Sequence, residues 1–290
     1  MGFAWTYVIF VLTAISLSTI LVMLLSLDEV ATIAPDSEYY LTLARREDVP
    51  RPFCFRPMVP WLVGRDIHNW KLVTMAALVA QGVAIALLTG DLRAVILLLA
   101  LPGGARVSLR YPVLVDAPAM LVTIVAALTV GQLSPAWVVV WGIILAPYRE
   151  TAPLWLAVYA RSPWPLVGLP FALAALYWTF GRKPEVGRDN SFIRDPLQAC
   201  LIHRKGNFFD WRMMLLPWGV LLPLALLGNG WEAAAIWALS CVPLLIVTDT
   251  ARVQYWAAPA LIPLALAAPI PEFAWPVLLA LHVFNPYRGA

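Results

Sequence analysis

Apolar segments separated by polar loops constrain this chain more than any other feature. Residues 3–27 form one nearly unbroken apolar run, long enough to cross a bilayer with some tilt. Neither a basic start nor a small-residue cleavage site marks this run, so we expect a retained first helix and not a signal peptide. Further apolar segments follow at 72–90, 94–102, 113–130, 136–147, 152–160, 165–180, 213–228, 233–248, 256–268 and 274–284. The pattern predicts an all-α, polytopic helical membrane protein with about eleven transmembrane helices in a single membrane domain, 1–290.

The composition agrees with this class. The sequence is 61% hydrophobic and only 13% charged, whereas about a quarter of the residues of a soluble domain are charged. Its long Ala, Leu and Val runs also argue against a transmembrane β-barrel, whose strands alternate in polarity. This composition makes the lipid bilayer the expected partner, and the small formal net charge of +3 implies no nucleic-acid partner.

Charged residues gather on one side of the predicted bundle. If every apolar segment crosses, all of the 20 basic residues except Arg93 and Arg161 fall on one face. That face receives the polar loops 28–71, 103–112, 148–151, 181–212 and 249–255. A one-sided active site predicts such a distribution, whereas a transporter is expected to place polar groups near the middle of the membrane. The positive-inside rule, taken alone, puts the Arg-rich face in the cytoplasm.

The first polar loop, 28–71, contains two candidate juxtamembrane helices. Residues 32–46 read as an amphipathic helix that Asp36 or Ser37 can cap. Its apolar stripe consists of Tyr39, Tyr40 and Leu43. Four prolines interrupt 49–64, and a second short helix is expected from Pro57 to His68. The simplest interpretation of the first helix is an interfacial helix lying on lipid.

Three later motifs fall on the same face. Arg110-Tyr-Pro-Val-Leu-Val-Asp116-Ala-Pro118 precedes an apolar segment, Tyr148-Arg149-Glu150-Thr151 lies in a short loop, and Arg252-Val-Gln-Tyr255 precedes an Ala- and Pro-rich segment. Structural alternatives stay open for each. Arg149 and Glu150 are also typical of an ion pair at the membrane edge, and Arg252 of an arginine that reaches to the interface.

With the carboxylate after the first helix and the Arg56-Pro57-Met58-Val59-Pro60 turn, these motifs resemble the GT-C superfamily of integral-membrane glycosyltransferases. The resemblance covers 1–180, with its first loop at 28–71, and the late arginine motif; 181–290 would hold variable C-terminal spans and the loop 181–212. It implies transfer of a sugar from a polyprenyl-phosphate donor to a hydroxyl of a glycan, lipid or protein. It also implies a bacterial-type inner or plasma membrane, with the active site on the extracytoplasmic face.

The resemblance assigns roles to particular residues. Asp36 is the candidate general base, with Asp28 as an alternative. Arginine forks suit the lipid phosphate and its developing charge, and the candidates are Arg56, Arg110, Arg149 and Arg252. Glu150 is expected to compensate a buried arginine, and Asp116 to orient an arginine or act as a second carboxylate. Tyr40 and His68 complete the candidate substrate contacts.

The sequence also bears on cofactors, on a separate soluble domain and on disulfides. The first loop has no Asp-x-Asp pair, so no cofactor is required, and a divalent metal is possible but not implied. No large soluble domain follows the last apolar segment, so donor and acceptor are both expected to bind the membrane part. Cys54 and Cys200 could pair in an oxidising compartment, although free thiols are favoured. The competing functions are a transporter or flippase of a lipid-linked or anionic substrate, and a non-catalytic membrane scaffold.

Overall fold

The computed structural model describes residues 2–28, 31–32, 34, 36–50, 53–180, 214–242 and 250–285. Every regular element in these ranges is helical and none is a strand, which confirms the all-α prediction. The predicted loop 181–212 lies outside the described residues.

The first half of the chain supplies the longest helices. Their bounds are α1 (Gly2–Asp28), α2 (Ser37–Ala44), η1 (Phe53–Phe55), α3 (Met58–Val63), α4 (Ile67–Thr89), α5 (Arg93–Leu99), η2 (Pro102–Arg106), α6 (Val107–Arg110), α7 (Asp116–Val130), α8 (Pro135–Leu145), α9 (Ala152–Tyr159) and α10 (Trp164–Phe180). The second half contributes η3 (Leu216–Trp218), α13 (Leu221–Gly228), α14 (Gly230–Cys241), α15 (Thr250–Tyr255), α16 (Ala258–Leu266), η5 (Glu272–Ala274) and α17 (Trp275–Val283).

Each predicted apolar segment contains a helix, but the helices differ in length. Two of the described helices, over Ala4–Leu27 and Ile67–Thr89, are long and apolar enough to cross a membrane. Shorter apolar helices cover Asp116–Val130, Pro135–Leu145, Trp164–Phe180 and Glu272–Val283. The short helices α5 and α9, of 7 and 8 residues, fall on predicted segments that are themselves far below the roughly 20 residues a lone transmembrane helix needs.

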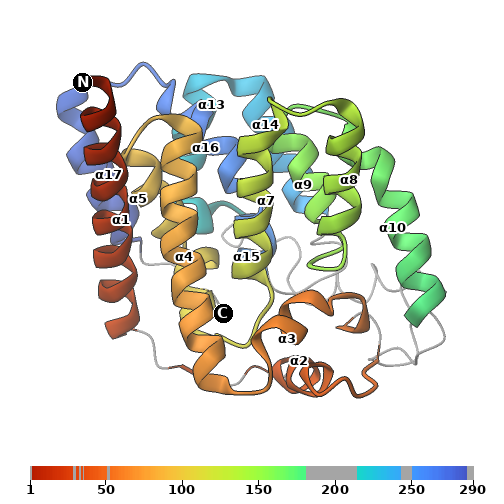
Figure 1. Ribbon diagram of the computed structural model, residues 1–290. Helices are drawn as coiled ribbons and strands as arrows, with labels where there is room; N and C mark the ends of the chain where they lie inside the picture. The colour runs from red at the N-terminus through yellow and green to blue at the C-terminus, as the bar shows by residue number, and fades with distance from the viewer. Residues whose placement is uncertain are drawn as a thin grey trace.

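The helices pack into a bundle with two unlike ends (Figure 1). The most extensive pairings join α8 with α10, α13 with α16, and α4 with both α1 and α7. The first-loop helices α2 and α3 lie at the bottom of the view, beside the lower end of α4 and below α7. Tight turns between consecutive helices close the upper end. The predicted asymmetry between a loop-rich face and a turn-rich face therefore corresponds to the two ends of the bundle.

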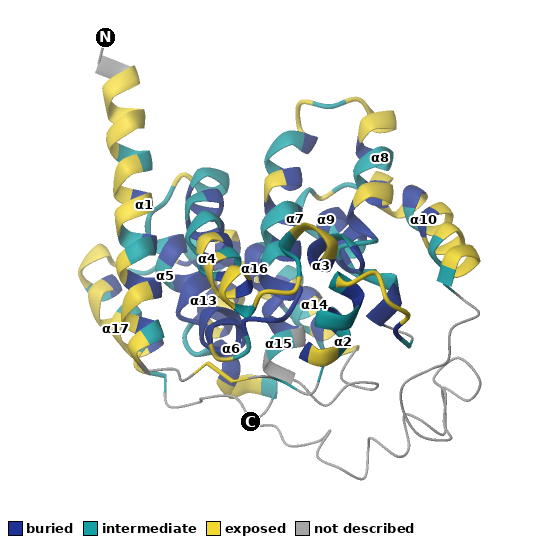
Figure 2. Cartoon of the chain, turned by 60° about the horizontal axis from the view of Figure 1, so that its bottom comes forward, coloured by how far each residue is buried: buried dark blue, intermediate teal, exposed yellow. Residues whose placement is uncertain are grey.

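The core lies in the middle of the bundle, and apolar side chains are exposed on its outer helices (Figure 2). The main buried cluster is drawn chiefly from α5, α7, α9, α13 and α16. A second cluster joins α1 to α4 and α5, and a third holds the first-loop helices against the segment before α7. The outer helices α1, α10 and α17 instead expose large apolar side chains, such as Trp178, which is 90% exposed.

Two boundaries differ from the prediction. The expected loop 103–112 is largely helical, because η2 and α6 continue the chain after α5. Within η2 the backbone kinks at Gly104, whose φ of −92° and ψ of −107° are not helical. The second expected helix of the first loop is present as α3, but its predicted end at His68 is wrong: α3 ends at Val63, and Gly64 takes a left-handed φ of 79°. His68 instead belongs to α4, which begins at Ile67. Asp66 is the N-cap of α4, and its carboxylate accepts a hydrogen bond from the backbone N–H of His68.

The first predicted loop helix is confirmed as α2, with one correction. Asp36 occupies the N-cap position, but its carboxylate accepts no capping hydrogen bond. Tyr40 and Leu43 are buried as the apolar stripe predicts. The carboxylate that the pattern assigned to capping therefore points to another partner. Cys54 on η1 is buried, and Cys200 lies outside the described residues.

Candidate functional site

Arg56 joins the first loop to the turn between α8 and α9. Its Nε donates to Glu150 Oε2 at 2.8 Å, its Nη2 pairs with Glu150 Oε1, and its Nη1 donates to the Tyr40 hydroxyl at 3.0 Å. Burial lowers the pKa of Arg56, but Glu150 and Tyr40 together raise it well above its ordinary value. Burial raises the pKa of Glu150, and Arg56 outweighs this effect, so that the pKa falls to about 2. Both groups are charged at neutral pH.

Asp116 is the centre of a second set of contacts at the start of α7. Its carboxylate forms an ion pair with Nη1 of Arg149, and the indole N–H of Trp256 donates to its Oδ1 at 3.2 Å. Nε of Arg252 lies 3.8 Å from its Oδ2. Because the Asp116 side chain is only 8% exposed, these three groups are what makes a buried carboxylate tolerable there.

Arg149 lies between the two sets. It follows Tyr148 directly and precedes Glu150, and its guanidinium stacks over the Trp256 ring with the carbon 5.3 Å from the ring centroid. Burial, together with the positive charges of Arg56 and Arg252, lowers its pKa to about 9. Arg149 remains a cation at neutral pH, and Asp116 is its ion-pair partner.

Arg252 connects these buried groups to the first loop. Its Nη2 lies 3.9 Å from Asp36 Oδ2, and its Nε lies at a similar distance from Asp116. Both contacts are ion pairs that exceed the range of an N–H···O hydrogen bond. The Asp36 side chain is 39% exposed, which makes it the most accessible of the three carboxylates.

Six charged residues thus form two neighbouring sets of ion pairs, which adjoin because Arg149 of one set directly precedes Glu150 of the other. We call the two sets together the charged cluster. It contains three guanidiniums and three carboxylates and so has no net charge; its members are Asp36, Arg56, Asp116, Arg149, Glu150 and Arg252. They come from the first loop, the start of α7, the turn before α9, and α15. All six were predicted from the sequence as candidate site residues, and Tyr40, another candidate, contacts the cluster through Arg56.

Two predicted residues lie outside the charged cluster. The Arg110 side chain is exposed at the end of α6, with its guanidinium carbon 5.5 Å from the Tyr111 ring centroid. Its carbonyl accepts from the backbone N–H of Thr32 at 2.7 Å, so this residue contacts the first loop through its backbone. The His68 side chain is exposed in the first turn of α4, and the backbone N–H of His68 donates to the Asp66 carboxylate. The Asp28 side chain lies outside the described part of the chain.

Sequence reasoning missed two buried residues in this region. Trp256 contacts both Asp116 and Arg149, and its carbonyl accepts a hydrogen bond from the Tyr159 hydroxyl. The available signal was its spacing of four residues from Arg252, which places both on one helical face. Arg106 is only 8% exposed, in the η2 segment that we had assigned to a loop.

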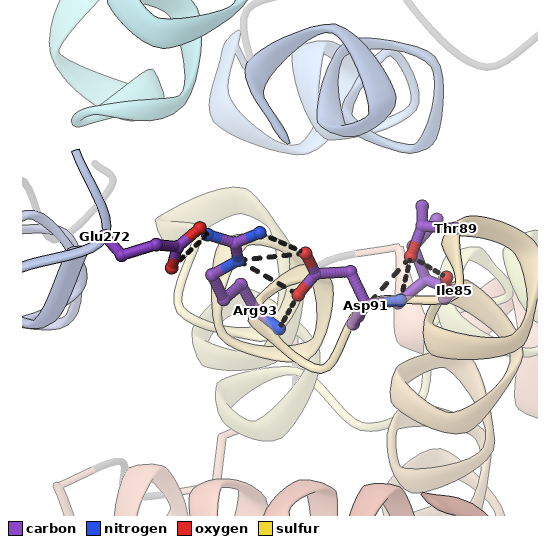
Figure 3. A network of polar contacts seen from close by, with 5 residues as sticks. All are labelled: Ile85, Thr89, Asp91, Arg93 and Glu272. Atoms are coloured by element: carbon purple, nitrogen blue, oxygen red, sulfur yellow. Dashed lines mark hydrogen bonds and ion pairs between the residues drawn. The ribbon is translucent and has the colours of Figure 1, made fainter. Parts of the chain in front are cut away.

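A separate polar network lies at the opposite end of the bundle (Figure 3). Arg93 Nε donates to both oxygens of Asp91, at 3.1 Å (Oδ1) and 2.9 Å (Oδ2), and Nη2 donates to Oδ2 at 2.6 Å. Nη1 of Arg93 donates to Glu272 Oε1 at 3.1 Å. Arg161 pairs with Glu232 at 2.6 Å. The two arginines that the sequence assigned to the turn-rich face are therefore both paired with acids. A cavity of about 560 Å³ lies beside Arg93, away from the charged cluster.

No group of three or more His, Cys, Asp or Glu side chains among the described residues has the arrangement of a metal site. The cluster's oxygen atoms are instead paired with guanidiniums. The chemistry that this set offers is one accessible carboxylate for proton transfer, beside cationic forks that suit a phosphate.

Comparisons with known proteins found no match. No family model fits the chain, and no curated protein or solved structure is significantly similar to it. The functional argument therefore depends on the motifs and on the geometry of the charged cluster.

Proposed function

We propose that the chain is an integral-membrane glycosyltransferase, which moves a sugar from a polyprenyl-phosphate donor to an acceptor hydroxyl at the extracytoplasmic face. The observation that supports it most is the charged cluster. It brings a partly exposed carboxylate of the first loop within 3.9 Å of Arg252, which shares the Asp116 carboxylate with Arg149.

Membrane insertion is proposed from length, composition and exposure together. Two helices are long and apolar enough to cross. The shorter helices continue into flanking segments in the same bundle, as α5 does into η2 and α6. Large aromatic side chains are exposed on the outside, including Trp178 at 90% and Trp231 at 85%. A lipid environment covers such surface, whereas a soluble protein rarely exposes so much of it.

Asp36 is the proposed general base. As it takes the proton of the acceptor hydroxyl, the oxygen attacks the anomeric carbon of the sugar and the bond from that carbon to the phosphate oxygen breaks. Asp36 suits this role because its side chain is accessible, while Asp116 and Glu150 are held by buried partners. A positioned carboxylate contributes about 10²–10⁴-fold to such a proton transfer.

Arg252 and Arg149 are the proposed phosphate-binding residues. The leaving polyprenyl phosphate gains a negative charge when the bond to the sugar breaks, and guanidiniums stabilise that charge. Arg252 contacts Asp36 and Asp116 at distances longer than hydrogen bonds. A phosphate held by Arg252 would therefore lie beside Asp36, the proposed base. Binding also offsets the repulsion between Arg252 and Arg149 that lowers the pKa of Arg149.

Lipid retention tests the proposal. Detergent-purified protein is incubated with polyprenyl phosphate and an excess of ordinary phospholipid, and retained lipids are measured by native mass spectrometry. We expect wild type to retain polyprenyl phosphate, and Arg252→Gln to retain it at least tenfold less. Arg65→Gln, which changes an exposed arginine outside the cluster, is the control and should behave as wild type. Retention of ordinary phospholipid alone by wild type contradicts the proposal.

A further inference from the structure

A groove at the turn-rich end of the bundle has the shape of a site for one amphiphile. It is the cavity of about 560 Å³ between α5 and α17. Arg93 and Glu272 line one end of it, and Ile96, Leu279 and Val283 line the remainder with apolar groups. Polar and apolar linings are thus separated along the groove.

The polar end carries more negative than positive charge. Asp91 and Glu272 share one guanidinium, that of Arg93 (Figure 3), which gives this group a net charge of −1. All three nitrogens of Arg93 already donate to carboxylate oxygens. Each carboxylate can accept about four hydrogen bonds. The Glu272 side chain is 84% exposed, so a further donor can reach it.

The Trp275 ring also contacts the Arg93 guanidinium. Its ring centroid lies 4.4 Å from the Arg93 guanidinium carbon, at a favourable distance for a cation–π contact. An anionic group would have to displace a carboxylate from Arg93 and approach a site of net negative charge. A cationic donor meets neither obstacle.

The apolar part of the groove follows one face of α17. Trp275, Leu279 and Val283 are spaced four residues apart and all line the cavity, so the wall extends for about 12 Å along the helix. Ile96 of α5 forms part of the facing wall. This length accommodates much of one acyl chain, beginning at the charged end.

We propose that this groove binds a phospholipid with a primary-ammonium headgroup, such as phosphatidylethanolamine. Its ammonium donates to Glu272 and Asp91, and one acyl chain lies along α17. The inference rests on the membrane insertion included in the proposed function, but not on the glycosyltransferase reaction.

A competition between three headgroups tests it. Purified protein is exposed to equimolar phosphatidylethanolamine, phosphatidylcholine and phosphatidylglycerol in mixed micelles, and retained lipids are measured by native mass spectrometry. We expect preferential retention of phosphatidylethanolamine, because choline has no N–H donor and glycerol phosphate is an anion. Glu272→Gln, which removes the exposed charge, should reduce this retention at least threefold. Glu47→Gln, which changes an exposed acid at the other end of the bundle, should not.

A second variant checks the position of the acyl chain. Ala280 lines the groove from an exposed position, so Ala280→Phe fills the groove without overpacking the core and should also reduce retention. Equal retention of the three lipids, or unchanged retention in both groove variants, overturns the inference. A wild-type protein that retains phosphatidylethanolamine but no polyprenyl phosphate overturns the proposed function and leaves this inference standing.

Discussion

Asp36 is more accessible than the other two acids of the charged cluster. Its proposed role as general base can be tested separately from phosphate binding. Asp36→Asn keeps the size and polarity of the side chain and removes its basicity. We expect release of polyprenyl phosphate from the donor to fall at least about 100-fold, while retention of polyprenyl phosphate persists. Glu38→Gln, which changes an exposed acid on the same helix, should keep full turnover. A carrier would lose little transport with Asp36→Asn, so an unaffected rate favours the flippase alternative.

Trp256 allows a test of how the buried half of the cluster is held. Trp256→Phe keeps a ring beneath Arg149 but removes the N–H that donates to Asp116. We expect a loss of about 1–3 kcal/mol in unfolding free energy, the usual cost of leaving a charged acceptor unsatisfied. The control is Trp218→Phe: Trp218 is equally buried, and its indole nitrogen has no hydrogen-bond partner among the described residues.

The same variant should show coupling to Asp116. In an Asp116→Asn background, Trp256→Phe should cost much less, because the charged acceptor is already absent. Thermal unfolding of the single and double variants in detergent measures this coupling. Additive effects would show that Trp256 contributes by packing alone.

Glu150 predicts an acid-sensitive contribution to stability. Its pKa in the folded protein, about 2, lies below its ordinary value of 4.5, so the unfolded chain takes up the proton first as the pH falls. The stabilisation is full above about pH 5 and is lost progressively as the pH falls toward 2, by at most about 3 kcal/mol. Unfolding midpoints between pH 7 and pH 3 should therefore fall more for wild type than for Glu150→Gln. Glu47→Gln should follow wild type, and parallel curves for Glu150→Gln and wild type would contradict the assignment.

How much of the charged cluster the sequence predicts is clearest for individual residues. Its six members were predicted because they lie in motifs that resemble those of the GT-C superfamily and because all of them fall on one predicted face. Their pairings do not follow, since Arg56 and Glu150 are 94 positions apart. Such pairings depend on which helices are neighbours and how each is rotated. Trp256 was missed for a related reason, because a tryptophan at the end of an apolar segment is equally typical of a membrane interface.

Among the elements, α15 is the one whose position most affects the charged cluster. It supplies Arg252 and leads directly to Trp256, and it packs closely against η2. A methyl group on Gly104 would collide with the Tyr255 ring, whose hydroxyl is fixed by donation to Gln81 at 2.7 Å. The absence of a side chain at Gly104 is therefore what allows α15 to approach.

Gly104→Ala should displace α15 and with it the cluster's late arginine. We expect a destabilisation of about 1–3 kcal/mol, typical of overpacking, together with weaker retention of polyprenyl phosphate. Gly131→Ala is the matched control, because a methyl group there meets nothing within 4 Å. Thermal unfolding and lipid retention measured on both variants check this. A Gly104→Ala protein that matches Gly131→Ala in both would show that the close approach is unimportant.

The boundaries of the elements were less predictable than their presence. Most of the helices are apolar on nearly all sides, so the sequence indicates where a helix is but not which face it presents. The extension through η2 and α6 was missed because Pro102, Gly103 and Gly104 together favour a loop. In the structure these residues form a bent helical segment against α15, which means that tertiary packing outweighs the local preference.

At the scale of the whole molecule, the two ends of the bundle carry different kinds of charge pairs. The loop-rich end contains the charged cluster, and also exposes Arg45, Arg46, Arg65 and Lys71. At the turn-rich end, Arg93 and Arg161 are each paired with acids. The positive-inside rule, which counts basic residues, would put the loop-rich end in the cytoplasm. The proposed reaction instead requires the loop-rich end to lie outside the cytoplasm. The orientation of the protein in the membrane therefore distinguishes the proposed reaction from the expectation of the positive-inside rule.

Cysteine labelling in intact cells measures that orientation. Glu47→Cys places a thiol on the exposed first loop, and Gln132→Cys places one on the exposed turn between α7 and α8. We expect a membrane-impermeant maleimide to label Glu47→Cys in intact cells and Gln132→Cys only after permeabilisation, with wild type as the control for its native thiols. The reverse pattern would place Asp36 in the cytoplasm and exclude an extracytoplasmic donor. Labelling of both positions from the same side would contradict a bundle whose two ends lie across a membrane.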